Sequence, residues 1–153
     1  MSILLRDLID NYIKQEKLYQ KVALSSHQQT SLLESQPVDP VMIREVLGQR
    51  QVLMDDVAAI NEEAKQLQEK MRKYYGLKAF TLTEIEGIVN DIDFTELKRT
   101  LNQMSEVLKG ISQNDLKNQV LMRQAVAEAH VQPTISSQQA SSAYRQSMEH
   151  KNK

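Results

Sequence analysis

Apolar residues recur at steps of three and four positions along most of this chain, which is the spacing of one face of an α-helix. From about residue 2 to residue 33 the stripe starts apolar, and serine and glutamine take its positions in the second half. We therefore expect a first amphipathic helix whose second half packs loosely. Its stripe consists of Leu5, Leu8, Tyr12, Gln15, Tyr19, Val22, Ser26, Gln29 and Leu33, widened by Ile9, Ile13 and Ala23.

A second helix is predicted to start at Pro40 and to run for about 36 residues, or about 54 Å. Asp39 followed by Pro40 is typical of an N-cap with a proline in the first turn. The strict heptad spacing indicates packing against another long helix in an elongated bundle. Arg50 falls on the stripe, and we expect it to extend along the surface rather than to anchor a partner. The stripe is Ile43, Val46, Arg50, Leu53, Val57, Ile60, Ala64, Leu67, Met71 and Tyr74.

The segment YYGLKAFTLTEI, residues 74–85, predicts a corner at the middle of the chain. Gly76 is expected to end the second helix in the left-handed conformation that glycine adopts easily. Thr81 and Glu84 have the spacing of a capping box, which would start a new helix. That helix is predicted to be short, from about residue 82 to residue 90.

The last long helix is predicted from Phe94 to about residue 131, because Asp93 and Glu96 form a second possible capping box. Its stripe is Phe94, Leu97, Leu101, Met104, Leu108 and Ile111. Beyond Ile111 the stripe falls on polar residues, Asn114 or Asp115 and then Asn118.

Two interpretations of Asn114 and Asn118 remain open from the sequence. We favour a polar, partly exposed end of the bundle. The alternative is a buried polar pair that sets helix register or receives the backbone of a partner.

Pro133 ends the helical pattern, and the Ser/Gln-rich remainder has little to bury. We expect a disordered tail at 132–153 after a helical domain at 1–131. Within the tail, Ala140, Tyr144 and Met148 fall at i, i+4 and i+8, so a short helix could form there on a partner. The predicted fold class is all-α: an elongated antiparallel bundle of three long helices plus one short helix.

Composition argues against several classes of function. The chain has no cysteine, and its 3 histidines lack the spacing of a metal site in a helical bundle. The net charge is −1 with both signs mixed, so a nucleic-acid-binding stripe is not expected. No apolar run approaches a membrane span, and the N-terminal segment lacks the features of a signal peptide. We expect no enzymatic activity, no metal or cofactor, no membrane insertion and a cytoplasmic location.

Each of the three long helices carries an apolar band, and the short helix is too small to cover rods of this length. A helix from a partner could complete such a bundle. Homodimerisation is the competing possibility.

From about residue 8 to residue 130, the order and lengths of these elements resemble the FlgN family of flagellar export chaperones. The corner RKYYGLKAFTLTEI is similar to the family's glycine followed by Thr-Leu-x-Glu-Leu/Ile. The last helix carries the paired asparagines of NDLKNQVL, followed by MRQAVAEA, as in the family.

The resemblance implies a chaperone of flagellar type III secretion. Such a protein binds the C-terminal helical segments of the hook-associated proteins FlgK and FlgL and delivers them to the export gate protein FlhA. The implied client-binding residues are Leu108, Ile111, Asn114, Asn118, Leu121, Met122 and Ala125. Tyr144 is a hypothetical docking residue for the gate, or an inert tyrosine in the tail. The alternative function is a structural coiled-coil adaptor that self-associates through the same stripes.

Overall fold

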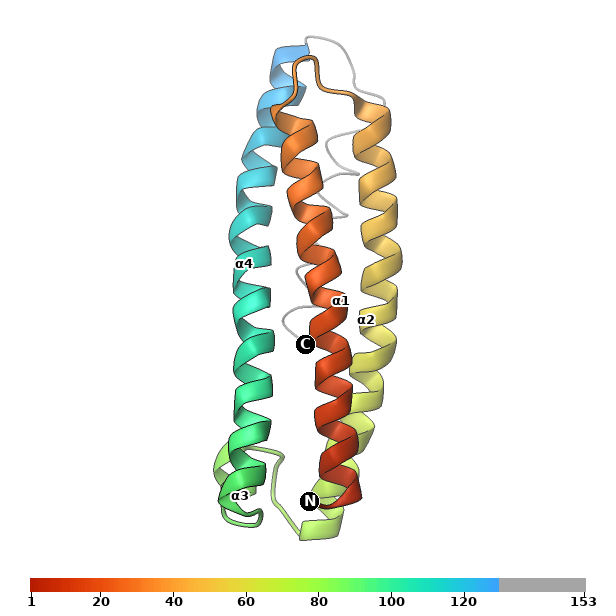
Figure 1. Cartoon of the computed structure of the whole chain (residues 1–153). Coiled ribbons are helices and arrows are strands. Elements are labelled where there is room, and N and C mark those ends of the chain that lie inside the picture. Colours follow the sequence, from red (N-terminus) through yellow and green to blue (C-terminus); the bar gives the residue numbers. More distant parts are fainter. Residues whose placement is uncertain (130–153) are drawn as a thin grey trace.

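The computed structural model describes residues 1–129, and the predicted tail with Tyr144 lies outside this range. The described chain is helical and contains no strand, which confirms the predicted all-α fold class. Three long rods lie beside one another, and a short helix lies at the end that carries residue 1; the first and last rods run in the same direction and the second runs antiparallel to both (Figure 1). The helices are α1 (Ile3–Glu34), α2 (Pro40–Tyr75), α3 (Leu82–Glu86) and α4 (Asp91–Ala129).

Helix α1 is the central element of the bundle. It packs against both α2 and α4, whereas no Cα atom of α2 comes within 8 Å of a Cα atom of α4. Figure 1 shows α1 in front, with α2 and α4 on either side. All nine stripe positions predicted for α1, from Leu5 to Leu33, are buried, whereas Ile13 is exposed.

The expectation that the second half of α1 packs loosely is wrong. Ser25, Ser26, Gln29 and Thr30 are all buried, with Ser26 and Gln29 fully so. Helix α1 therefore stays in contact with its neighbours to its end, through polar side chains instead of apolar ones.

Local capping chemistry explains where the helices begin and end. The Asp39 carboxylate accepts a hydrogen bond from the Val41 N–H at 3.0 Å, so α2 begins as predicted. Gly76 ends α2 with φ 65°, a left-handed conformation that favours glycine. The Thr81 hydroxyl accepts from the Glu84 N–H at 3.3 Å, which confirms half of the predicted capping box.

The other half of that box differs from the prediction. The Glu84 carboxylate reaches past Thr81 and accepts from the backbone N–H groups of Lys78 and Ala79, at 3.2 and 3.0 Å. Glu84 thereby ties the corner itself to α3.

The boundary between α3 and α4 also corrects the prediction. Helix α3 ends at Glu86, well before residue 90, and α4 starts at Asp91, before the expected Phe94. The Asn90 side chain accepts from the Asp93 N–H at 2.8 Å and donates to the Asp93 carboxylate at 3.2 Å. Asn90 therefore has the capping role that the sequence suggested for Asp93.

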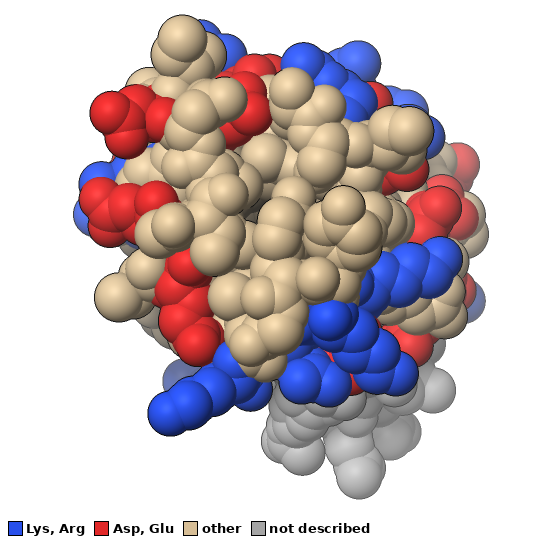
Figure 2. Space-filling model, turned by 90° about the horizontal axis from the view of Figure 1, so that it is seen from below, with Lys and Arg blue, Asp and Glu red and all other residues tan. Residues whose placement is uncertain are grey.

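The core is a series of three clusters along the bundle axis. The cluster nearest α3 centres on Leu8, Met71, Ile85 and Leu97. The middle cluster includes Tyr19 and Ile111, and the far cluster joins Leu33 to Ile43. Figure 2 views the bundle from the α3 end.

Candidate functional site

The residues that the resemblance implies for client binding lie on α4, but their environments differ. Ile111 is 1% exposed in the middle core cluster, and Asn118 is fully buried. Leu108 is half-buried against the middle cluster. Half-buried side chains also pack against the far cluster: Leu121, Met122 and Ala125. In this conformation, the half-buried residues offer surface to a client, whereas Ile111 and Asn118 contact α1.

A polar layer separates the middle and far core clusters. We use this name for Ser26 and Thr30 of α1, Arg50 of α2, and Asn114, Asp115 and Asn118 of α4. Asn114 Nδ2 donates to the hydroxyls of Ser26 and Thr30 at 2.8 and 3.0 Å. Asn118 Nδ2 donates to the Ser26 carbonyl at 2.9 Å, and Asn118 Oδ1 accepts from the Thr30 hydroxyl.

The layer decides between the two interpretations of the asparagines. Asn118 is fully buried, so the favoured interpretation of a polar, partly exposed bundle end is wrong for this residue, whereas Asn114 is half-buried. Both asparagines bond to α1, as the alternative of a register-setting polar pair requires. Because each amide needs its partner opposite, the pair fixes the register between α1 and α4.

Arg50 of α2 and Asp115 of α4 form a buried ion pair. Among residues 1–129, no other ion pair joins these two helices. Both guanidinium nitrogens, Nη1 and Nη2, donate to the carboxylate at 2.7 Å. The Ser26 hydroxyl also donates to Asp115, at 3.0 Å. Arg50 is 2% exposed and Asp115 is fully buried, so the prediction of a surface arginine is wrong. This bidentate geometry is favoured for a buried ion pair.

The ion pair also identifies the face of α4 that is directed toward α2. Leu101, Leu108 and Met122 are spaced from Asp115 by multiples of seven residues, so they lie on the same face. All three are half-buried. On α2, the half-buried Leu47 shares the far cluster with Met122.

The two helices thus meet through side chains while their backbones stay apart. We call this side of the molecule the α2–α4 face. It combines half-buried apolar residues with the polar layer, and a further helix could bury those residues more completely.

A different, shallow hollow lies between α1 and α4, with a volume of about 730 Å³. Leu24, His27, Gly110 and Lys117 are among its lining residues. Leu24 is 64% exposed there. This hollow is the competing surface for an apolar ligand.

The pKa shifts in the described chain have local causes. Burial raises the pKa of Tyr12 and of Tyr19, and the hydrogen bond from Gln68 partly opposes this rise for Tyr12. The Arg72 side chain lowers the pKa of the exposed Glu69 carboxyl. These shifts follow from packing and a surface ion pair.

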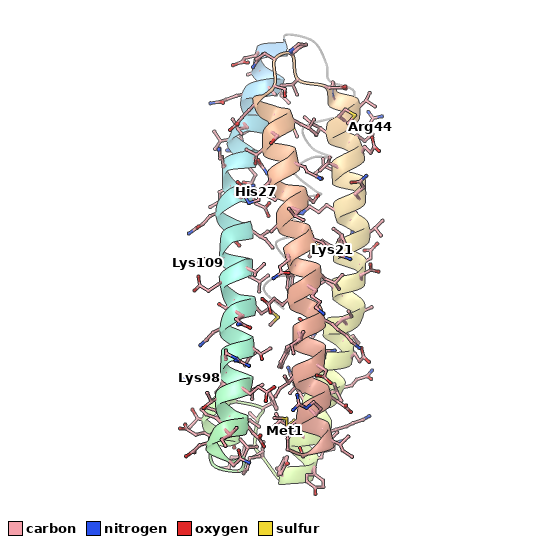
Figure 3. All side chains as sticks on the ribbon, in the orientation of Figure 1. Met1, Lys21, His27, Arg44, Lys98 and Lys109 are labelled. Atoms are coloured by element: carbon pink, nitrogen blue, oxygen red, sulfur yellow. The ribbon has the colours of Figure 1, made fainter. Side chains whose placement is uncertain are left out.

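Basic side chains are spread over the helices. Lys98 and Lys109 of α4 point outward in Figure 3, and Arg44 lies on α2. Among residues 1–129, no three His, Asp or Glu side chains gather as a metal site. No helix in that range is long and apolar enough to cross a membrane.

Sequence reasoning missed the partnership of Arg50 with Asp115, although both residues fell on predicted stripes. Opposite charges on the core faces of two helices are the signal that could have found it. It also missed the roles of Ser26 and Thr30, which had been assigned to a loosely packed end.

Comparison with protein-family models, curated proteins and solved structures finds no match to this chain.

Proposed function

We propose that this protein is a flagellar export chaperone whose α2–α4 face holds the C-terminal helical segments of hook-associated proteins similar to FlgK and FlgL. The observation that carries the proposal is the separation of α2 from α4, whose Cα atoms stay more than 8 Å apart. A helix laid along this side would complete the bundle. The resemblance of the corner and of the last helix to the FlgN family supplies the class of client.

The chemistry of the face suits reversible binding. A client helix would cover half-buried leucine and methionine side chains, which gain only part of the free energy of full burial. Methionine adapts its shape to different partners, so Met122 suits a face that accepts more than one client. A disordered client segment must also lose conformational entropy on binding, which keeps the affinity moderate. A chaperone that must release its client before export needs such an affinity.

The proposal assigns distinct roles along α4. Leu108, Leu121, Met122 and Ala125 contact the client. The hydrogen bonds of Asn114 and Asn118 to α1, and the packing of Ile111 in the middle cluster, hold α4 in position beneath the client. In this scheme the delivery step to an FlhA-like gate protein belongs to the tail, with Tyr144 as the docking residue.

Titration calorimetry with synthetic C-terminal segments of the organism's own hook-associated proteins tests the client. We expect micromolar or tighter binding by the full chain. Leu108→Ser should weaken it about tenfold, because a partly covered leucine contributes about 1.4 kcal/mol. Leu24→Ser is the matched control, since Leu24 is exposed in the hollow between α1 and α4.

The outcomes separate the candidate surfaces. If Leu24→Ser weakens binding and Leu108→Ser does not, the client lies in the α1–α4 hollow and the proposed face is wrong. If no C-terminal segment of a hook-associated protein binds the full chain, the proposed chaperone function is wrong for these clients. A tight dimer that ignores them would support the self-associating adaptor. Circular dichroism of both variants excludes misfolding as the cause.

The tail is tested with the same segments and with a soluble domain of the gate protein. A chain ending at residue 131 should still bind the client. Tyr144→Ala should reduce binding of the client-loaded chain to the gate domain, and unchanged gate binding would remove Tyr144 from the proposal.

A further inference from the structure

The end of the bundle that carries α3 exposes large apolar side chains that the proposed client face does not use. Ile92 is 80% exposed, Ile3 79% and Tyr74 73%. They belong to the first turn of α4, the start of α1 and the last turn of α2. Leu82, the first residue of α3, and Ile88, which follows α3, are exposed as well. We call this surface the α3 end.

Figure 2 looks directly at the α3 end and shows an uncharged area across its centre, with charged side chains around its edge. Several large apolar side chains open to water at one end of a protein favour association, because larger exposed apolar surfaces mark sites of interaction. The five apolar residues lie on all four helices and their connections, so the patch belongs to the folded end as a whole.

The charges around the patch are mixed, with Glu69 among the basic residues at the end of α2 and the N-terminal amine paired with Asp93 at the start of α4, but each side has an excess of one sign. The end of α2 and the corner carry Lys70, Lys73 and Lys78, whereas α3 and the start of α4 carry Glu86 and Asp91; all five are exposed. In Figure 2 the largest basic group lies at the lower right and several acidic side chains lie along the left, while both signs occur along the top and right edges. Within residues 1–129, no ion pair engages Lys70, Lys78, Glu86 or Asp91.

We propose that the α3 end binds a second copy of this chain, end to end, about a two-fold axis perpendicular to the bundle. Such an axis brings the apolar centres of two copies together. It also turns the acidic side of each end onto the basic side of the other. A two-fold interface requires a self-complementary surface, and this division of charge supplies one. A partner of one charge sign would match only half of the edge.

The size of the end sets the strength of the contact. Three helices, each about 10 to 12 Å across, present about 300 Å² of cross-section at one end, so two ends bury about 600 Å² in total. This is below the usual size of specific interfaces, so we expect a weak, reversible dimer with a dissociation constant of about 100 µM. The opposed charges should make its formation sensitive to salt. The α2–α4 faces of both copies remain uncovered, so dimerisation and client binding are compatible.

Sedimentation equilibrium from low to high micromolar concentration, together with small-angle X-ray scattering, tests the proposal. The protein should carry no N-terminal tag, because residue 1 lies at this end (Figure 1). An end-to-end dimer nearly doubles the maximum dimension of the particle, whereas a side-by-side dimer leaves it almost unchanged. Ile92→Asp should weaken association at least tenfold, and Val52→Asp is the matched control, since Val52 is 61% exposed in the middle of α2.

Charge variants test the two-fold arrangement itself. A chain with Lys70→Glu, Lys73→Glu and Lys78→Glu should not self-associate, nor should a chain with Glu86→Lys and Asp91→Lys. An equimolar mixture of the two should form a heterodimer, because each then meets the opposite charge.

Three results would overturn the proposal: a monomer at 500 µM, a dimer whose maximum dimension matches that of the monomer, or a dimer that Ile92→Asp leaves intact. Calorimetry of Ile92→Asp with the client segments keeps this inference separate from the proposed function. Unchanged client binding by that variant is expected, because the α3 end is not part of the α2–α4 face.

Discussion

Breaking the ion pair between Arg50 and Asp115 should destabilise the protein more than any other single polar substitution in the bundle. Both side chains are withdrawn from water, and two hydrogen bonds of 2.7 Å join them. Asp115→Asn would leave a buried guanidinium without its counter-charge, and Arg50→Met would leave a buried carboxylate. Each change should cost about 3 to 5 kcal/mol of the free energy of unfolding. That is a large share of the roughly 5 to 15 kcal/mol typical of a folded domain.

The double variant distinguishes a buried ion pair from two independent contacts. With both charges removed, no uncompensated charge remains, so the double variant should lose about 2 to 3 kcal/mol less than the sum of the single losses. Urea unfolding followed by circular dichroism at 222 nm gives all four free energies. Gly48→Ala provides a stabilised background if a single variant is partly unfolded in water. Single losses below about 1 kcal/mol that simply add would refute the reasoning, because a solvated pair behaves in that way.

The remaining predictions concern helix ends and pH, and urea unfolding measures each of them. Gly76→Ala should lower the free energy of unfolding by about 1 kcal/mol, because the backbone at Gly76 is left-handed. Gly48→Ala should raise it by about the same amount, because the added methyl group meets open space within α2. Changes of the same sign in both variants would contradict this assignment. Asn90→Ala should lower the free energy of unfolding by about 1 kcal/mol, because α4 loses its N-cap. An unchanged free energy of unfolding would mean that Asn90 is not the N-cap. Burial raises the pKa of Tyr12 and Tyr19, so the stability that this adds is complete below their ordinary pKa of 10.0 and is lost as pH rises through the raised values. Stability should therefore fall as pH rises above about 10, and less steeply in the Tyr12→Phe, Tyr19→Phe double variant.

Local sequence chemistry was sufficient to predict most of the fold. The start of α2 depends on Asp39 and Pro40, and its end depends on Gly76, so both follow from residues adjacent in the chain. The buried stripe of α1 was predicted because helical periodicity does not depend on which helix covers it. The boundary before α4 was misplaced because Asn90 and Asp93 are both good N-caps, and the sequence does not rank them.

The polar layer required knowledge of which helices face each other. Arg50 and Asp115 lie 65 positions apart, and Ser26 and Asn118 lie 92 apart. Each of these residues alone is polar and suggests exposure. Their burial becomes favourable only when α1, α2 and α4 bring the partners together, which periodicity along one helix does not show.

The α3 end was not predicted for a related reason. Ile3, Tyr74 and Ile92 belong to segments distant in sequence, and each alone resembles an ordinary residue near a helix end. The fold places their segments at one end of the bundle (Figure 1).

Site-specific photo-crosslinking tests most directly whether clients bind on the α2–α4 face. The chain contains no cysteine, so a single introduced cysteine can carry a benzophenone label at a known position. Ser112→Cys places the label on α4 one helical turn from Asp115, on the same face. Ser31→Cys makes the same substitution on the exposed face of α1 and serves as the control. We predict crosslinks from residue 112 to the C-terminal segment of a hook-associated protein and none from residue 31. Crosslinking from residue 31 alone, or equally from both, would contradict the account.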